Sequence, residues 1–128
     1  MLFIVGGADN RAINLLEHLV LFGRENCDFT IFEGILYADD HDRLFRQIKE
    51  MFKGHIFAYY FDLSFEETLK RHEQKPNRHD FGEPEMKRWW RENDYINFID
   101  EKRISKESGI EETVDSIYED LTDDRCSV

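Results

Sequence analysis

Short runs of hydrophobic residues, separated by longer mixed stretches, predict the strands of this chain. Short apolar runs at residues 1–5, 29–32 and 56–61 are rich in β-branched or aromatic residues, as buried strands are. The run at 56–61 is apolar on both faces, which is typical of a parallel sheet covered by helices. A weaker run that includes Arg103 and Ile104 predicts one more strand.

Apolar residues at helical spacing predict two helices in the first half of the chain. One begins after Asp9 or Asn10 and ends at Gly23, and the other is capped by Asp39 or Asp40. The second helix ends at Gly54. Its amphipathic stripe consists of Leu44, Phe45, Ile48, Met51 and Phe52.

Three further helices are predicted from their start signals. Ser64 and Glu67 form a capping box for a helix that reaches about residue 72, and Pro84 suits the first turn of a short helix. A second capping box, at Ser108 and Glu111, starts the last helix, which extends to residue 121. We expect the acidic residues from 122 onward to form a frayed tail.

This alternation predicts an α/β fold with a mostly parallel sheet and flanking helices. The length of 128 residues fits one domain, and no shift in composition marks a linker. We therefore expect a single domain over residues 1–121, followed by the tail at 122–128. Ligands of such sheets bind at the carboxyl ends of the strands, which directs attention to residues 6–9, 33–34 and 62–64.

Charge and cysteine content narrow the classes of function. The chain has 17 Lys and Arg against 28 Asp and Glu, a net charge of −11. Nonspecific nucleic-acid binders and membrane-surface binders carry the opposite sign. Two cysteines make no disulfide framework, and no apolar run approaches the roughly 18 residues that span a bilayer. We therefore expect a cytoplasmic protein with no nucleic-acid or membrane partner.

Glu33 and a pair of tryptophans are candidate site residues. Glu33 directly follows a predicted strand, where a carboxylate holds Mg²⁺ through water or orients a nucleophile. The alternative is a helix cap or a solvated loop acid. Trp89 and Trp90 could stack on a base or another ring of a substrate or nucleotide, although adjacent tryptophans on a helix more often pack against the protein itself.

A basic cluster interrupts the otherwise acidic sequence between residues 71 and 79. It contains Arg71, His72, Lys75, Arg78 and His79. Arginine suits bidentate phosphate contacts and lysine supplies a point charge, so the segment could act as a lid over phosphates. A solvated polar turn is the alternative. No third ligand joins the two histidines, so the spacing does not favour a zinc site.

Several segments together resemble a known family. Residues 31–36, 59–72, 75–77 and 81–83, with Met86 and the tryptophan pair, are similar to the zeta-toxin-like and small-molecule phosphotransferase group of P-loop kinase-like proteins. The resemblance runs from about residue 10 to residue 121. It implies ATP-dependent phosphotransfer to a small-molecule acceptor, with ATP and Mg²⁺ as cofactors. It matches Glu33 to the acid after the Walker-B-like strand, and Arg71, Lys75 and, nearby, Arg78 to cations of the lid.

The phosphate-binding loop of that family has no match here. Residues 6–11 read Gly-Gly-Ala-Asp-Asn-Arg, without the Lys and the Ser or Thr of the G-x-x-x-x-G-K-[ST] motif. We therefore expect an N-terminally shortened member, either a shortened paralogue or a product begun at an internal Met. The missing central strand would leave a gap between the strands predicted at 29–32 and 56–61. Residues 1–5 would then replace that strand, or a partner chain would close the gap.

Three functions remain open from the sequence. The first is a phosphotransferase that uses Glu33, Arg71 and Lys75. The second is a non-catalytic binding module that retains the kinase fold. The third is an interaction subunit that docks through an exposed sheet edge, for example as a homodimer. The missing phosphate loop favours the second for this chain alone, so we expect no ATP turnover.

Overall fold

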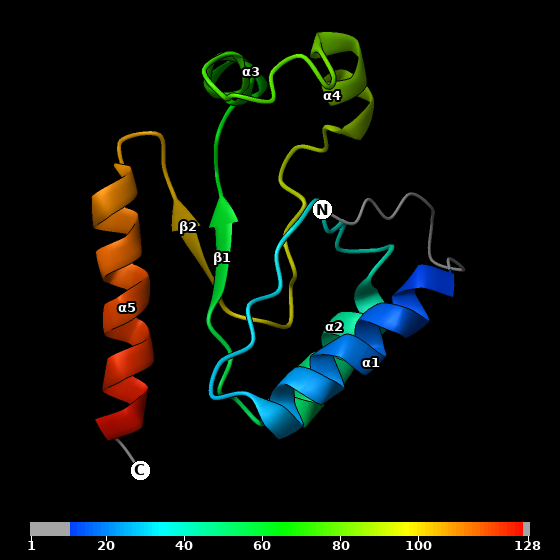
Figure 1. Ribbon diagram of the computed structural model, residues 1–128, viewed down its shortest axis with the longest axis vertical. Coiled ribbons are helices and arrows are strands. Elements are labelled where there is room, and N and C mark those ends of the chain that lie inside the picture. Colours follow the sequence, from blue (N-terminus) through cyan, green and yellow to red (C-terminus); the bar gives the residue numbers. More distant parts are fainter. Residues whose placement is uncertain (1–10, 127–128) are drawn as a thin grey trace. The chain divides into compact units, whose positions relative to one another are not determined.

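The computed structural model describes residues 11–126 (Figure 1). These residues contain five helices and two parallel strands, a small mixed α/β fold. The chain divides into two compact units, Met1–Ile56 and Phe57–Val128, and each is described by itself. The single domain expected over residues 1–121 stays a prediction. The replacement strand expected at residues 1–5 lies outside the described part of the chain.

The first unit is a helix pair, α1 (Arg11–Asn26) and α2 (Asp42–Phe52). Ile13 and Leu16 of α1 form a core cluster with Leu44 of α2, which is 0% exposed. Partly buried hydrophobic residues pack around these three side chains. The amphipathic stripe predicted for α2 therefore supplies the contact that holds the pair together.

The ends of these helices differ in part from the prediction. Gly23 does not end α1, which continues to Asn26. The glycine instead leaves room for Thr30, because a Cβ at this position would lie only 2.4 Å from the Thr30 Oγ1 atom. His41, rather than Asp39 or Asp40, precedes α2. The predicted stop at Gly54 is confirmed, since α2 ends two residues earlier and Gly54 adopts a φ of +93°.

The strand predicted at residues 29–32 is wrong. Residues 27–41 connect α1 to α2 without a strand. Ile31 is 89% exposed and Phe29 is 47% exposed, whereas Phe32 packs against the core cluster. Backbone groups in a strand need a neighbouring strand to bond with, and no strand of residues 11–56 supplies one. The apolar run therefore contributes one anchoring side chain instead of a strand.

The second unit is built on two parallel strands, β1 (Ala58–Phe61) and β2 (Glu101–Ile104). Ala58 lies opposite Glu101 and Phe61 lies opposite Ile104. The parallel direction agrees with the prediction, but β1 is shorter than the apolar run at 56–61. Side chains alternate between the faces of a sheet, so neighbouring positions along each strand point to opposite sides.

Three helices complete the second unit: α3 (Phe65–Glu73), α4 (Glu83–Trp89) and α5 (Ile110–Cys126). The predicted cap of α3 is confirmed, because the Ser64 hydroxyl accepts a hydrogen bond from the Glu67 amide at 3.2 Å. Pro84 lies in the first turn of α4, as predicted.

The last helix departs from the prediction at both ends. The Thr113 amide donates to the carbonyl of Gly109 at 3.0 Å, so Gly109 rather than Ser108 caps α5. The helix continues to Cys126, past the end predicted at residue 121, and residues 127–128 of the predicted tail lie outside the described part of the chain. Intrahelical bonds of Thr122 with the carbonyls of Tyr118 and Glu119 accompany this continuation.

Within residues 11–126, every helix is too short or too polar to cross a bilayer.

Candidate functional site

A group of polar and aromatic side chains gathers at the carboxyl end of the parallel sheet. We name it the Asp62 cluster, and it consists of Tyr60, Asp62, Asn93, Tyr95 and Arg103. Asp62 follows β1, and its amide donates to the carbonyl of Ile104 at 2.9 Å, which extends the strand pairing by one bond. The Asp62 carboxylate therefore starts from a fixed backbone at the edge where α/β sheets bind ligands.

Tyr95 organises this cluster from the segment between α4 and β2. The Arg103 guanidinium lies 4.0 Å from the centre of the Tyr95 ring, and the edge of this ring meets Tyr60 at a centroid distance of 4.8 Å. The Tyr95 hydroxyl lies 2.9 Å from the Asn93 side-chain oxygen and 3.4 Å from the Asp62 carboxylate. Arg103 thus rests on an aromatic plane, which fixes the orientation of its donors.

The charged members of the Asp62 cluster stay accessible to solvent. The side chain of Asp62 is 41% exposed and that of Arg103 is 57% exposed, and their nearest N and O atoms are 3.8 Å apart. This separation exceeds a hydrogen bond, so the ion pair leaves hydrogen-bonding capacity on both groups. Burial, with the nearby carboxylates as a smaller cause, raises the pKa of Tyr60. The Tyr60 phenol therefore stays neutral within the cluster.

Asn93 has a strained backbone within this cluster. Its φ is +53°, in the left-handed region that asparagine tolerates better than most residues. The chain turns there, and the Tyr95 amide donates to the Asn93 carbonyl at 2.9 Å. Strained positions of this kind concentrate at functional sites. The sequence directed attention to residues 62–64 but missed Asn93, Tyr95 and Arg103, because they come from other segments.

Arg71, predicted as a lid cation, joins α3 to the turn that follows β2. Its Nε donates to the Glu67 carboxylate at 2.9 Å, and a terminal nitrogen donates to the Lys106 carbonyl at 3.1 Å. The hydrogen bond from Arg71 also lowers the pKa of Glu67. These contacts fasten α3 to the turn that follows β2. A role of Arg71 towards phosphate stays a prediction, and this guanidinium already has two partners within the fold.

The rest of the predicted lid is a run of turns fastened at its base. Lys75 and Arg78 are exposed in the segment between α3 and α4. His72, only 5% exposed, closes this segment, because its Nε2 lies 2.9 Å from the Phe81 carbonyl oxygen and the two rings stack at 4.4 Å. Lys75 and Arg78 are therefore presented to solvent on an anchored loop, and their role towards phosphate stays a prediction.

The two tryptophans pack against different aromatic partners. The Trp89 ring meets Phe81 edge-on at 5.1 Å, and the Trp90 ring meets Phe65 at 5.5 Å. Both tryptophans are half-buried. These contacts join α4 to α3 and to the segment before α4, which is the packing role weighed from the sequence. Stacking on a ligand ring stays a prediction for both residues.

Glu33 belongs to the first unit, in the exposed connection between α1 and α2. The other predicted site residues belong to the second unit, and the units are described separately. A site shared by Glu33 and the lid cations therefore stays a prediction. Among residues 11–126, no group of three or more His, Cys, Asp or Glu side chains is arranged to hold a metal ion.

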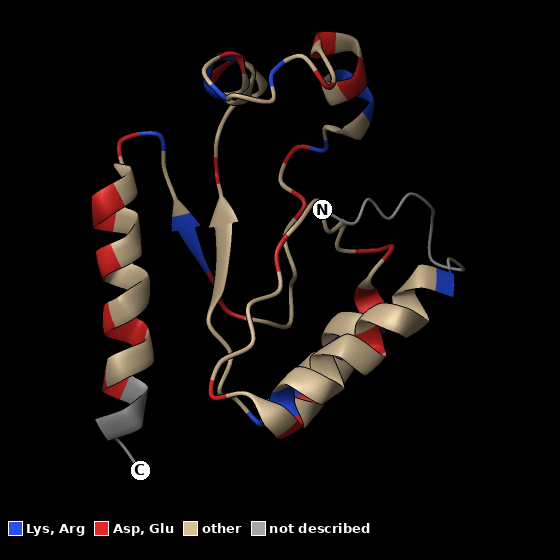
Figure 2. Ribbon diagram, viewed as in Figure 1, with Lys and Arg blue, Asp and Glu red and all other residues tan. Residues whose placement is uncertain are grey.

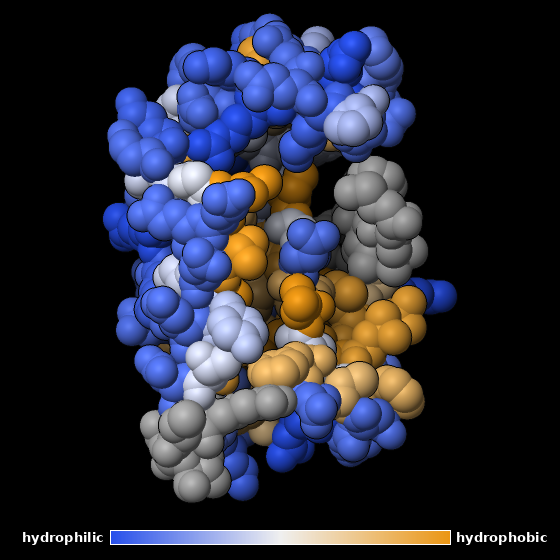
Figure 3. Space-filling view, turned by 60° about the vertical axis from the view of Figure 1, so that its left-hand side comes forward, coloured by the Kyte–Doolittle hydropathy of each residue, from blue (hydrophilic) through white to orange (hydrophobic). Residues whose placement is uncertain are grey.

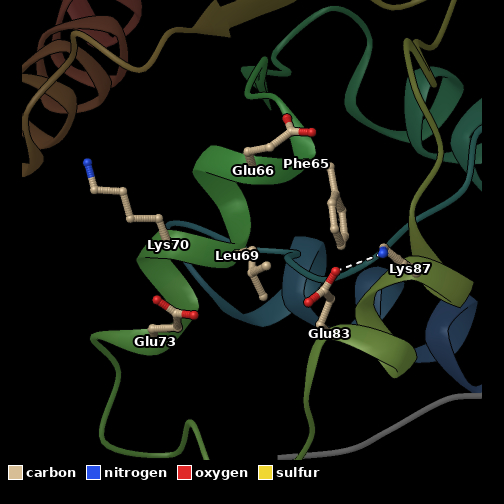
Figure 4. Close-up of a pocket in the computed structure, with 7 residues that line it drawn as sticks. All are labelled: Phe65, Glu66, Leu69, Lys70, Glu73, Glu83 and Lys87. Atoms are coloured by element: carbon tan, nitrogen blue, oxygen red, sulfur yellow. Dashed lines mark ion pairs between the residues drawn. The ribbon is translucent and has the colours of Figure 1, made fainter.

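A cavity of about 270 Å³ lies between α3 and α4 (Figure 4). Phe65 and Leu69 supply its apolar wall, and the ion pair between Lys87 and Glu83, at 2.7 Å, borders it. The other lining residues are Glu66, Lys70 and Glu73. Because carboxylates and ammonium groups are mixed at its rim, this cavity selects no one class of ligand. The Asp62 cluster is the more specific site.

Comparisons of the sequence with family models and with curated proteins, and of the fold with solved structures, gave no match. The resemblance to P-loop kinase-like proteins therefore rests on the segments quoted above.

Proposed function

We propose that this protein is a P-loop kinase-like binding module that holds a small anionic molecule at the Asp62 cluster and does not transfer phosphate by itself. One observation carries the proposal, namely the accessible Asp62 and Arg103 side chains arranged by Tyr95 at the carboxyl end of the sheet. A cytoplasmic location is part of the proposal, since the exposed thiol of Cys27 would stay reduced there.

The chemistry of the cluster suits a ligand with two kinds of polar group. A guanidinium held on an aromatic plane binds a phosphate or a carboxylate through paired N–H donors. A nearby carboxylate accepts a hydrogen bond from a hydroxyl or an amine. A phosphorylated molecule with a free hydroxyl, such as a nucleotide, carries both groups.

The donor set fits the phosphate of a nucleotide better than it fits a metal ion. The Arg103 guanidinium lies 3.8 Å from the Asp62 carboxylate and opposes a cation there, whereas Mg²⁺ is usually held by carboxylates together with substrate phosphates. Phosphoryl transfer also needs cations that neutralise the developing charge. The sequence lacks the Walker lysine, and Arg71 is engaged by Glu67 and the Lys106 carbonyl. ATP and Mg²⁺ therefore enter the proposal as candidate ligands.

The test is a titration of the ¹⁵N-labelled full chain with ATP, ADP and inorganic phosphate, with and without Mg²⁺, followed by amide NMR. We expect the amides of Asp62, Tyr95 and Arg103 to shift, and Arg103→Gln to remove the response. Arg88→Gln is the matched control, because Arg88 is an exposed cation that pairs with Glu85 at 3.8 Å on α4. Shifts that survive Arg103→Gln, or no shifts at all, would contradict the proposal.

The non-catalytic part of the proposal has its own measurement. Pure protein incubated with ATP and Mg²⁺ should form no ADP beyond a blank. Clear Mg²⁺-dependent consumption of ATP would show that the chain supplies the missing charges from another segment. Repeating the assay with Glu33→Gln and Lys75→Ala would then identify whether the predicted residues are responsible.

The sheet supports a second candidate, a homodimer through its edge. β1 pairs with β2 on one side, and no third strand of residues 11–126 joins the sheet. Phe61, at the end of β1, is 57% exposed. Unpaired strand edges readily add a strand from another chain. Light scattering at several concentrations tests this candidate: a dimer lost in Phe61→Lys supports it, and a monomer throughout contradicts it.

A further inference from the structure

Helix α5 exposes two parallel rows of side chains, one apolar and one acidic. The apolar row consists of Ile110, Val114 and Tyr118, and the acidic row consists of Glu111, Asp115 and Glu119. The apolar side chains are 85%, 59% and 67% exposed in that order, and all three acidic residues are exposed. Residues four apart lie on one side of a helix, so each row forms a continuous stripe and the two stripes adjoin.

The opposite side of α5 is fixed to the sheet, so the orientation of both rows is determined. The Tyr59 hydroxyl donates to the Asp120 carboxylate at 2.5 Å, and the Lys102 ammonium group donates to the other oxygen of the same carboxylate. The hydrogen bonds from Lys102 and Tyr59 lower the pKa of Asp120. The charge of Asp120 is therefore balanced within the fold, whereas the acidic row lies on the surface.

From residue 110 to residue 123, α5 places no Lys or Arg beside the acidic row. The sequence from residue 110 to residue 123 contains six acidic residues and no Lys or Arg. Figure 2 shows this as red segments without blue ones along α5. Carboxylates four residues apart on a helix repel one another, and Asp123 near the end opposes the helix dipole. A cationic partner would relieve this repulsion.

We propose that the two rows form a docking surface for a basic amphipathic helix of a partner protein. The apolar row would receive the apolar side of that helix, and the acidic row would pair with its Lys or Arg side chains. In Figure 3, which brings this side of the molecule forward, hydrophobic side chains lie beside hydrophilic ones. A second copy of the chain is disfavoured, because its own acidic row would face this one. Anionic membranes and nucleic acids are repelled for the same reason.

The first test uses two synthetic peptides of 21 residues and the full chain. Both peptides carry leucine at helical spacing; the flanking positions are lysine in one and glutamate in the other. We expect the lysine peptide to bind in a fluorescence anisotropy titration, more weakly as salt is added, and the glutamate peptide not to bind. Equal binding of both peptides, or binding of neither, would overturn the proposal.

Variants of the chain then locate the binding. Neutralising the acidic row with Glu111→Gln, Asp115→Asn and Glu119→Gln should weaken binding of the lysine peptide about tenfold. Each exposed ion pair contributes a modest part of the binding free energy. The matched control is Glu73→Gln, Asp80→Asn and Glu92→Gln, three exposed acids outside α5 whose removal changes the net charge equally. We expect the control to weaken binding less than about threefold. Equal losses in both triple variants would overturn the proposal.

The apolar row is tested with Ile110→Ala, Val114→Ala and Tyr118→Ala. Alanine is the best helix former, so circular dichroism should show that α5 persists. We expect the lysine peptide to bind at least about tenfold more weakly, because its apolar side loses its contact. Unchanged affinity in this folded variant would overturn the proposal. If the unmodified chain dimerises and this triple variant does not, a second copy of the chain occupies the surface. That result would also overturn the proposal.

Discussion

The two units of the chain are held together by different kinds of contact. In the first unit, the buried side chains are mostly aliphatic and lie between two helices, as Ile13, Leu16 and Leu44 do. One surface ion pair also joins these helices. In the second unit, specific polar and aromatic pairs connect the elements, such as Tyr59 with Asp120 and His72 with Phe81. Apolar packing tolerates exchange among residues of similar size, whereas paired contacts fix individual groups in place. The unit that relies on paired contacts is the one that carries the Asp62 cluster.

The largest effect is expected from breaking the apolar contact of the first unit. Leu44→Ala should lower the free energy of unfolding by about 2–5 kcal/mol, because a fully buried leucine leaves a cavity. Urea denaturation measures the loss, and amide hydrogen exchange should place it in α1 and α2. Leu15→Ala is the control, since Leu15 is 50% exposed, and it should cost far less. Equal losses would show that Leu44 is not the centre of that core.

The next effect should come from the aromatic anchor of the second unit. His72→Ala removes the stacking on Phe81 and the ring nitrogen beside its carbonyl oxygen. We expect a loss of about 1–3 kcal/mol in the free energy of unfolding. Limited proteolysis should then cut the segment between α3 and α4 faster. His79→Ala, at an exposed position in the same segment, should leave both measurements unchanged.

A smaller effect separates one hydrogen bond from the packing around it. Tyr59→Phe removes the hydroxyl that donates to Asp120 and keeps the ring. We expect a loss of about 1–2 kcal/mol in the free energy of unfolding, since the acceptor is charged. Tyr118→Phe is the matched control, because Tyr118 is 67% exposed on the same helix, and it should be neutral. If the two variants unfold alike, the Tyr59 contact adds nothing to stability.

The smallest effect concerns the pH range over which this contact acts. Burial, with the bond to Asp120 as a further cause, raises the pKa of Tyr59. A raised pKa contributes stability that is present below the unfolded value, about 10, and is lost as pH rises towards the folded value. The lowered pKa of Asp120 contributes stability that is present above the unfolded value, about 4, and is lost as pH falls towards the folded value.

The contributions of Tyr59 and Asp120 to the pH dependence of stability can be measured separately. Denaturation at a series of pH values should show a decline above pH 10 that flattens in Tyr59→Phe. The decline on the acid side should flatten in Asp120→Asn. An alkaline decline that is the same with and without the Tyr59 hydroxyl would show that other groups cause it.

The elements of the second unit could be predicted because their signals are local. Ser64 and Glu67 mark the start of α3 within four residues, and Pro84 marks the start of α4. The strand predicted at 29–32 failed because an apolar run becomes a strand only where a neighbour pairs with it. For the same reason, no local pattern could show that Phe32 packs against a helix pair.

The candidate site was predictable only in part. The position of Asp62 after an apolar run directed attention to the correct sheet edge. Tyr95 and Arg103 could not be joined to it, because their contacts depend on how the segment between α4 and β2 turns at Asn93. Arg71 offered a signal that favoured a structural role, since Glu67 lies four residues before it on the same helix.

The pairing of β1 with β2 also sets the order in which the chain can fold. The strands are joined through α3, α4 and the segment that holds Tyr95, so on the order of 40 residues must be gathered before the first bond between them forms. Contacts between distant parts of a sequence form slowly, whereas a helix hairpin such as α1 and α2 closes a much shorter loop. Refolding should therefore begin with helical signal from the hairpin. The Asp62 cluster, assembled from both ends of the long connection, should form only in the slow phase.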